Sequence, residues 1–220
     1  MSSSEKNLRV LIAKTISEGL TQRNLKELHL ESLADAGLRG DLLSDLSDAL
    51  SHVSWCLIGG MAVVLRGYRR TTDDIDIMVN ATPDEFTRLS MYANSSGFKC
   101  GVSRTGTILR MTHKEMGAEV ELLLATSPEQ TQAVVRATPL PVMGYKIRVP
   151  QAIDLIALKV WTVSRVPNRA NKDWGDVNGL MGTMSSEDLN ILESDLLPTL
   201  PASTHRIFQA YLAAHRIRLE

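Results

Sequence analysis

The chain of 220 residues has few cysteines, few aromatic residues and no long hydrophobic run. Two cysteines, Cys56 and Cys100, are too few for a disulfide scaffold and fit a reducing compartment. No apolar stretch approaches the roughly 20 residues of a membrane-spanning helix. The first residues, MSSSEKNLRV, contain no apolar signal segment. We therefore expect a cytoplasmic protein with no membrane partner.

The sequence also lacks an excess of charge of either sign. It has 24 Lys and Arg residues against 25 Asp and Glu residues, a net charge of −1. Proteins that bind nucleic acid without sequence preference are normally clearly basic, so general nucleic-acid binding is not expected. The five histidines are scattered without the spacing of zinc ligands. A hydrophobic fraction of 44% excludes an intrinsically disordered chain and allows a sizeable core.

The hydrophobic pattern changes twice along the chain, which predicts three regions: an N-terminal helical segment (1–52), an α/β core (53–150) and a C-terminal helical region (151–220). The expected fold class is α+β, a mixed β-sheet flanked by helices at both ends of the chain. Apolar spacing and capping signals place helices at 8–16, 25–33, 41–50, 61–66, 82–95, 128–135, 151–164, 172–181, 186–196 and 204–218. Short apolar or alternating runs place strands at 53–58, 74–79, 98–102, 107–112, 119–124 and 146–149.

Two aspartates in the second predicted strand carry the strongest chemical signal. Side chains alternate along a strand, so Asp74 and Asp76 share one face while the apolar residues between and after them share the other. Two carboxylates on one face of a core strand repel each other, and burying them is costly unless a positive charge compensates. A hard divalent cation such as Mg²⁺ would provide that charge. The alternative is a solvated face with ordinary surface carboxylates.

A pair of glycines, Gly59 and Gly60, stands where the first predicted strand turns into a short helix. Residues without a Cβ let phosphates approach the backbone, and the N–H groups of a helix start attract anions. The short helix returns the second strand beside the first, which places this turn next to the acidic face. Together they describe a site for a metal–triphosphate complex, although a glycine pair can also serve only to make a sharp corner.

These motifs resemble the signature of the DNA polymerase β-type nucleotidyltransferase superfamily. The resemblance rests on Leu57-Ile-Gly59-Gly60-Met-Ala, then Gly67, then Arg70-x-Thr72-x-Asp74-Ile-Asp76-Ile. It covers residues 55–80, with weaker agreement to about Val177, and it is closest to minimal bacterial members, the AbiEii-type toxins and the antibiotic-modifying nucleotidyltransferases. The resemblance implies that Gly59, Gly60, Arg70 and Thr72 bind the nucleotide. Arg69 is a second candidate phosphate contact, and Arg70 could instead brace the aspartates.

Members of the superfamily carry a third carboxylate on a later strand, and here the resemblance assigns that place to Glu121. Glu119 and Glu121 share one face of the predicted strand 119–124. Glutamate in place of aspartate moves the carboxylate by about a bond length, against a tolerance of roughly 0.5 Å in a catalytic site. The resemblance implies that Asp74, Asp76 and Glu121 are catalytic and hold two Mg²⁺ ions, with Mn²⁺ as the alternative metal. A solvated edge strand with two surface glutamates is the competing interpretation.

The C-terminal half contributes a lysine and two aspartates to the list of candidate functional residues. Lys159 interrupts an almost wholly apolar helix, so it must either meet an anion or extend to solvent. Related toxins carry a lysine in a similar helix near the nucleotide, and an Arg/Lys-Asp-x-x-Asp segment that matches Lys172 to Asp176. Asp173 and Asp176 share a helix face and could orient Lys159 or the acceptor. Asp173 could equally favour a helix N-terminus. The resemblance places Lys159 and Asp176 among the nucleotide-binding residues.

The resulting functional hypothesis is a Mg²⁺-dependent enzyme that transfers an NMP from an NTP to an acceptor hydroxyl on a tRNA, a protein or a small molecule. It could be the toxin of a toxin–antitoxin pair, with an antitoxin protein as partner, or an antibiotic-modifying enzyme. Glu121 in place of aspartate motivates a second hypothesis, a catalytically degenerate member that binds nucleotide or a partner protein. A helical interaction protein with an incidental acidic face is a third.

Overall fold

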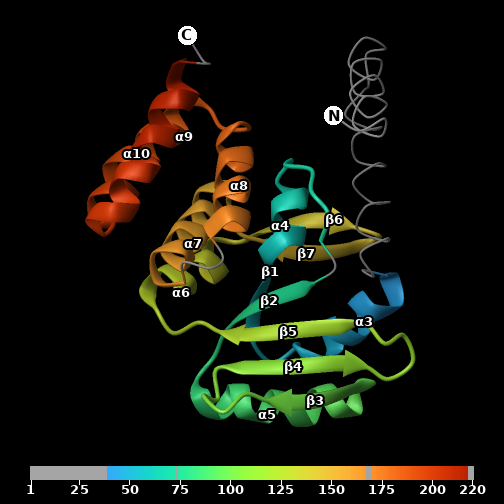
Figure 1. The fold of residues 1–220 in the computed structure, drawn as a ribbon. Helices are drawn as coiled ribbons and strands as arrows, with labels where there is room; N and C mark the ends of the chain where they lie inside the picture. The colour runs from blue at the N-terminus through green and yellow to red at the C-terminus, as the bar shows by residue number, and fades with distance from the viewer. Residues whose placement is uncertain (1–38, 73, 167–169, 218–220) are drawn as a thin grey trace, which may run out of the picture.

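The computed structural model of the protein describes residues 39–72, 74–166 and 170–217 (Figure 1). The predicted helices at 8–16 and 25–33 lie outside the described residues. The described part combines a five-stranded mixed sheet, a two-stranded hairpin and surrounding helices, which confirms the expected α+β class.

The five-stranded sheet has the order β1-β2-β5-β4-β3. Strands β2 and β5 run parallel, and the other neighbouring pairs are antiparallel. All five strands were expected, with small shifts at their ends. Their bounds are Ser54–Ile58 (β1), Ile75–Asn80 (β2), Phe98–Val102 (β3), Ile108–His113 (β4) and Glu119–Leu124 (β5). Because β5 lies between β2 and β4, Glu121 does not stand on an edge strand.

A short helix, α4, connects the first two strands. It spans Gly59–Leu65, so both glycines belong to its first turn instead of preceding it. Gly59 has φ +66°, a left-handed conformation that favours glycine because it has no Cβ. Strands β1 and β2 pair antiparallel with Ile58 opposite Asp76, so the short helix does return the second strand beside the first, as expected.

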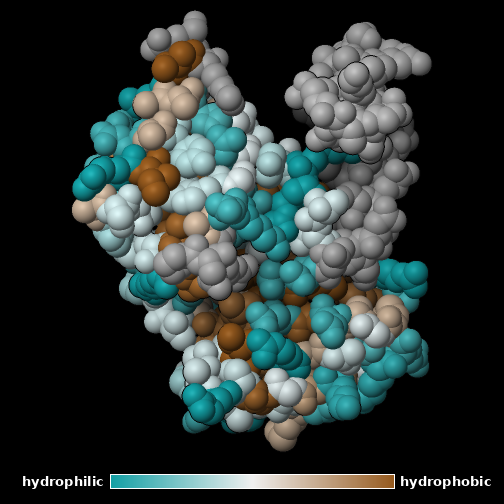
Figure 2. Space-filling view, viewed as in Figure 1, coloured by the Kyte–Doolittle hydropathy of each residue, from teal (hydrophilic) through white to brown (hydrophobic). Residues whose placement is uncertain are grey.

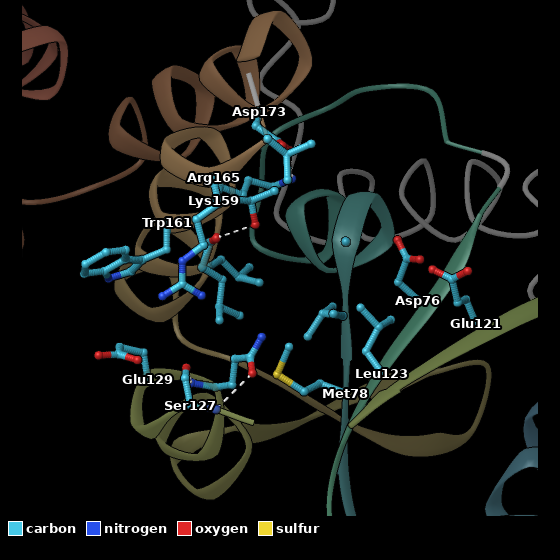
Figure 3. A pocket seen from close by; sticks show the side chains of 17 residues that line it. Asp76, Met78, Glu121, Leu123, Ser127, Glu129, Lys159, Trp161, Arg165 and Asp173 are labelled. Atoms are coloured by element: carbon cyan, nitrogen blue, oxygen red, sulfur yellow. Dashed lines mark hydrogen bonds and ion pairs between the residues drawn. The ribbon is translucent and has the colours of Figure 1, made fainter. Parts of the chain in front are cut away.

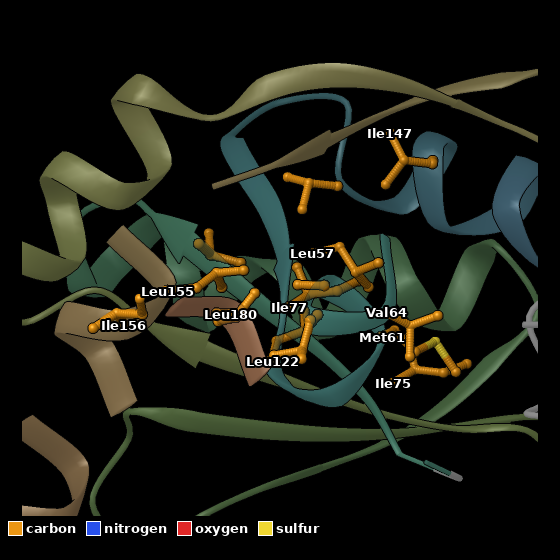
Figure 4. Packing of buried hydrophobic residues seen from close by; sticks show 14 of the residues in the cluster. Leu57, Met61, Val64, Ile75, Ile77, Leu122, Ile147, Leu155, Ile156 and Leu180 are labelled. Carbon is orange, nitrogen blue, oxygen red and sulfur yellow. The ribbon is translucent and has the colours of Figure 1, made fainter. Parts of the chain in front are cut away.

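The two faces of the sheet have different roles. One face is mostly apolar: Leu57, Ile77 and Leu122 from three neighbouring strands pack into the main core with side chains of α4 and the C-terminal helices (Figure 4). Burial of each such side chain contributes about 1.5–3 kcal/mol to the stability of the fold. The opposite face is only partly apolar, with Cys56 and Met78 packed against the end of α6. Alternation along β2 and β5 places Asp76 and Glu121 on this second face.

Local signals explain where several helices begin. In α5 (Pro83–Ser95), the Thr82 hydroxyl accepts from the Glu85 N–H at 3.3 Å, and the Glu85 carboxylate accepts from the Thr82 N–H at 2.8 Å. This reciprocal capping box confirms the predicted start. Helix α6 (Pro128–Arg136) begins with the same device, formed by Ser127 and Gln130. The third predicted helix is α3 (Gly40–Ala49), which buries its leucines beneath the sheet.

A strand that the sequence analysis did not predict, β6 (Thr138–Val142), pairs antiparallel with β7 (Tyr145–Val149). Two prolines, Pro139 and Pro141, lie within β6, and proline cannot donate to a sheet ladder. The pairing tolerates them because β6 pairs only with β7. Backbone N–H groups on the other edge of β6 are therefore not needed as hydrogen-bond donors to a neighbouring strand. Met143 and Gly144 form the turn, both with positive φ (49° and 86°), as a tight hairpin requires.

The C-terminal helices gather at one end of the molecule, far from β3 (Figure 1). They are α7 (Ala152–Arg165), α8 (Ala170–Met181), α9 (Ser186–Ile191) and α10 (Ala202–Ile217). The single α-helix predicted over 186–196 is wrong in its second half, where α9 continues as a π-helical turn, Leu192–Leu196, and a 3₁₀ turn, Leu197–Thr199. Pro198 explains the change, because its ring would clash with the carbonyl four residues earlier in a regular α-helix.

The face of the molecule in Figure 2 is mostly hydrophilic, with hydrophobic atoms exposed in smaller patches. The large hydrophobic side chains that remain exposed come from several elements, among them Met91 of α5, Val135 of α6 and Ile207 of α10. In the part of the chain that the structure describes, no helix has both the length and the hydropathy to cross a membrane.

Candidate functional site

Asp76 and Glu121 lie directly opposite each other on neighbouring parallel strands. Asp76 of β2 and Glu121 of β5 are register partners, and Figure 3 shows their side chains next to each other. Both residues are half-buried. Neighbouring strands are separated by only about 4.8 Å, so the two carboxylates share one small region of the sheet. The structure therefore brings together two of the three carboxylates that the sequence analysis singled out.

Asp74 stands apart from this pair. Strand β2 begins at Ile75, so Asp74 lies one residue before the paired residues of the strand. Its side chain is 71% exposed and lies 3.9 Å from the Lys172 amine, in a separate groove that Arg70 and Thr72 also line. Within residues 39–72, 74–166 and 170–217, no group of three or more Asp, Glu, His or Cys side chains is arranged to hold a metal ion.

The acidic pair nevertheless fits a divalent cation in the kind of ligand it offers. Asp76 and Glu121 supply carboxylate oxygens, which hard cations such as Mg²⁺ prefer, and two neighbouring half-buried carboxylates gain from a shared positive charge. Glu121 already has one compensating partner, since Arg110 of β4 is its register neighbour and donates to its carboxylate at 3.0 Å. Arg110 is 69% exposed, which limits the strength of this pair. A metal at Glu121 would have to compete with it.

The two glycines make room for side chains of the protein itself. A Cβ at Gly59 would overlap the Asp76 carboxylate, and a Cβ at Gly60 would overlap the Thr72 side chain and the Arg70 guanidinium. Glycine at these positions is therefore required by packing around the acidic strand. Both glycines were expected to lie beside bound phosphate, and that role stays a prediction for their backbone N–H groups.

A buried ionic network joins Arg70 and Lys159 to Asp173 and Asp176. The Lys159 amine lies 3.0 Å from Asp173 Oδ1 and 2.6 Å from Asp176 Oδ2, and Arg70 Nη1 donates to both Asp176 oxygens at 2.9 and 3.2 Å. Of the two alternatives for Lys159, the structure shows the anion partner: its side chain is only 11% exposed. Arg70 braces Asp176 of α8, not the strand aspartates. The network contains two cations and two carboxylates and is neutral as a unit.

A cavity of about 240 Å³ opens between the acidic pair and helices α6 and α7 (Figure 3). Gly59, Asp76 and Glu121 bound it on the sheet side, and Lys159 and Asp173 also line it. Its wall includes polar and aromatic residues that were not singled out from the sequence: Ser127, Glu129 and Gln130 at the start of α6 and Trp161 and Arg165 of α7.

One signal for that wall was present in the sequence. Trp161 and Arg165 are four residues apart on a helix, the spacing at which side chains meet. The Arg165 guanidinium lies 5.3 Å from the centre of the Trp161 ring, within cation–π distance. Glu129, at the start of α6, adds a negative charge to the cavity wall. Hydrogen bonds that its carboxylate accepts from its own backbone N–H and from Ser127 lower its pKa. The cavity is thus lined by positively and negatively charged side chains together with apolar ones.

No protein-family model matches the chain, and no curated protein sequence matches it. Solved structures do. An antigenic nucleotidyltransferase-like protein from Paracoccidioides brasiliensis aligns over 91% of this chain and 92% of its own, with a TM-score of 0.53 at 18% identity. The antibiotic-resistance factor ANT(2″)-Ia aligns over 80% of this chain and 96% of its own, with a TM-score of 0.50 at 15% identity. These likenesses concern the fold: the chain has the nucleotidyltransferase-like fold, a mixed sheet with its acidic pair facing helices of the C-terminal half.

Proposed function

We propose that the protein is a Mg²⁺-dependent nucleotidyltransferase that moves an NMP from an NTP to an acceptor hydroxyl. One observation carries the proposal: Asp76 and Glu121 are paired in register at the edge of a cavity in a nucleotidyltransferase-like fold. These two carboxylates would hold the metal, with Asp74 as the third ligand that the sequence resemblance implies. A bound divalent cation supplies charge neutralisation on the triphosphate and on the leaving pyrophosphate.

The chain's own residues divide the remaining tasks. The Glu121 carboxylate accepts the proton of the attacking hydroxyl, and Lys159, fixed by its two aspartates, contacts a phosphate oxygen from the opposite wall of the cavity. The backbone N–H groups of Gly59 and Gly60 bind the outer phosphates. Arg70, Thr72 and Asp176 hold the nucleotide site in shape. In this proposal residues 53–150 form the catalytic core and residues 151–220 complete its cleft, with residues 1–52 as the N-terminal helical segment.

The acceptor is the finer part of the proposal. The sequence resemblance to AbiEii-type toxins favours a tRNA or protein hydroxyl and an antitoxin partner, whereas the structural likeness to the antibiotic-resistance factor ANT(2″)-Ia favours a small molecule. A net charge of −1 disfavours binding to long nucleic acids, so any RNA acceptor would be recognised locally. All three acceptors offer the same attacking group, and one assay can compare them.

The test measures transfer of label from each α-³²P-NTP to tRNA, to total protein and to aminoglycosides and lincosamides, with Mg²⁺, Mn²⁺ or EDTA. Asp76→Asn and Glu121→Gln should each reduce transfer at least about 100-fold, the equivalent of several kcal/mol of lost charge stabilisation. Glu119→Gln is the matched control, since Glu119 is an exposed carboxylate two residues away on the same strand. Persistence of Mg²⁺-dependent transfer in Asp76→Asn or Asp74→Ala would overturn the assignment.

A second candidate function, nucleotide binding without turnover, is favoured by two observations. Asp74 lies apart from the acidic pair, and Arg110 already holds Glu121. Calorimetry with NTP and Mg²⁺ distinguishes the candidates: binding without pyrophosphate release for any acceptor indicates the non-catalytic member. Arg110→Met sharpens the comparison. If Glu121 is a metal ligand, removing its competitor should strengthen the apparent Mg²⁺ affinity, while an unchanged affinity would indicate that Glu121 does not bind the metal.

A further inference from the structure

The segment Tyr68–Thr72, which leads into β2, is held at three points by other elements. The Tyr68 ring packs so closely over Gly179 of α8 that a Cβ on this glycine would overlap the ring. Two residues later, Arg70 donates two hydrogen bonds to Asp176 of the same helix. Thr72 fills the space left by the missing side chain of Gly60. We call Tyr68–Thr72 the lead-in segment.

Helix α8 contacts the lead-in segment and Lys159 through residues that are three positions apart. Asp173, Asp176 and Gly179 fall on one face of the helix. Asp173 and Asp176 hold Lys159, Asp176 also holds Arg70, and Gly179 receives Tyr68. One helix face therefore contacts both the cavity lysine and the lead-in segment.

Gly179 has a specific steric reason for being glycine. A glycine inside a helix is destabilising relative to alanine, so its presence calls for a reason. The same helix contains Gly175, where an added Cβ would meet no atom within 4 Å. At Gly179 the added Cβ would overlap three atoms of the Tyr68 ring, so either the ring or the helix must move. The helix is itself tied to Lys159 through two buried aspartates, which leaves the ring and its segment as the part that yields.

We propose that Gly179 and Asp176 are positioning residues: their face of α8 fixes the lead-in segment and thereby the place of Asp74 and the start of β2 relative to Asp76. The functional consequence rests on the proposed nucleotidyltransferase activity. Asp74 follows Thr72 by two residues, so its Cα lies within about 7 Å of the last anchored residue. A shift of the lead-in segment therefore moves Asp74, while Asp76, paired within the sheet to Ile58 and Glu121, stays in place.

Hydrogen–deuterium exchange on the full-length protein tests the positioning without requiring activity. In Gly179→Ala, amides in peptides covering residues 68–76 should exchange at least about fivefold faster, the lower end of measured coupling between sites, with β3 and β4 unchanged. Gly175→Ala is the matched control and should exchange like the wild type. Tyr68→Ala, which removes the ring without adding an atom, should also accelerate exchange there, and adding Gly179→Ala to it should have little further effect. Wild-type exchange of residues 68–76 in both single variants would overturn the proposal.

Kinetics then separate positioning from simple loss of folded protein. In Gly179→Ala the Mg²⁺ concentration that gives half-maximal transfer should rise at least about fivefold, with the KM for the acceptor unchanged. A purely structural defect would lower kcat by one factor at all Mg²⁺ concentrations, and that result would also overturn the proposal. The two proposals can fail independently. An inactive wild type together with accelerated exchange in Gly179→Ala would refute the proposed nucleotidyltransferase activity and support the positioning role of Gly179.

Discussion

Replacement of Lys159 by methionine tests the buried network most directly. Lys159→Met keeps the aliphatic stem and removes the amine that lies 3.0 Å from Asp173 and 2.6 Å from Asp176. Both carboxylates are nearly inaccessible, with side chains 2% and 3% exposed. The substitution removes the cation that contacts both carboxylates and leaves Arg70 paired with Asp176.

The magnitude follows from this burial. Removing one partner of a buried ion pair typically costs 3–5 kcal/mol, because the other charge is left in a poorly solvating environment. We therefore expect Lys159→Met to lower the free energy of unfolding by about 3–5 kcal/mol. The double variant Lys159→Met/Asp173→Asn removes one charge of each sign and restores neutrality, so it should be less destabilised than the single variant. Exposed ion pairs contribute about 0–1 kcal/mol, which sets the expectation for the control Lys172→Met, whose side chain is 52% exposed.

Urea unfolding at pH 7, followed by far-UV circular dichroism, measures all four proteins under one set of conditions. Typical domains have a total stability of about 5–15 kcal/mol, so the single variant would unfold at much lower urea concentrations. A loss below about 1 kcal/mol for Lys159→Met, equal to that of Lys172→Met, would refute the reasoning. It would mean that the Lys159 amine is solvated and that the network contributes no more than a surface pair.

Three further predictions concern single side chains. Burial raises the pKa of the Cys56 thiol to about 12, so at pH 8 Ellman's reagent should modify only Cys100 in the native protein and both thiols in urea; rapid native modification of Cys56 would contradict its burial. Burial also raises the pKa of Asp154, so the folded state binds this proton more tightly than the unfolded chain. The wild type should therefore gain stability relative to Asp154→Asn as the pH falls from 7 through the raised pKa toward the ordinary value of about 3.9, and parallel pH profiles in urea unfolding would be inconsistent with the shift. Gly59→Ala forces alanine into a left-handed conformation, which should lower the free energy of unfolding by about 1–2 kcal/mol, and drives its Cβ into the Asp76 carboxylate. The loss of transfer activity should therefore be larger than the loss of folded protein explains. Full activity would show that the position of Asp76 is not critical.

Features that depend on nearby residues were predicted well from the sequence. Alternation within Ile75–Asn80 and Glu119–Leu124 identified which side chains face the core, and the register of β2 against β5 then brings Asp76 and Glu121 together. The capping residue Thr82 marks the start of one helix, as predicted. These signals operate within a few residues of the chain, so tertiary context leaves them unchanged.

Features that depend on pairing between distant segments were not predictable in the same way. Whether Asp74 belongs to the strand is decided by where β1 and β5 stop pairing with β2, and no periodicity encodes that point. The hairpin strand β6 violates the usual exclusion of proline and forms because its partner β7 and the turn at Met143 allow it. The steric roles of Gly60 and Gly179 are likewise set by side chains distant in sequence.

The structure also changes how a triphosphate would be accommodated. The sequence suggested that Arg70 and Lys159 were both available to bind phosphates, but each is engaged by carboxylates of α8, and the four-residue network carries no net charge. The sheet side of the cavity adds the negative charges of Asp76 and Glu121, with Arg110 as the partner of Glu121. A highly charged anion that enters this cavity would therefore meet the carboxylates of Asp76 and Glu121 on its sheet side. In the proposed nucleotidyltransferase, divalent cations carried by the nucleotide would reduce the repulsion between its phosphates and these carboxylates. Because Arg70 and Lys159 are already held by carboxylates of α8, we expect nucleotide binding to depend on metal.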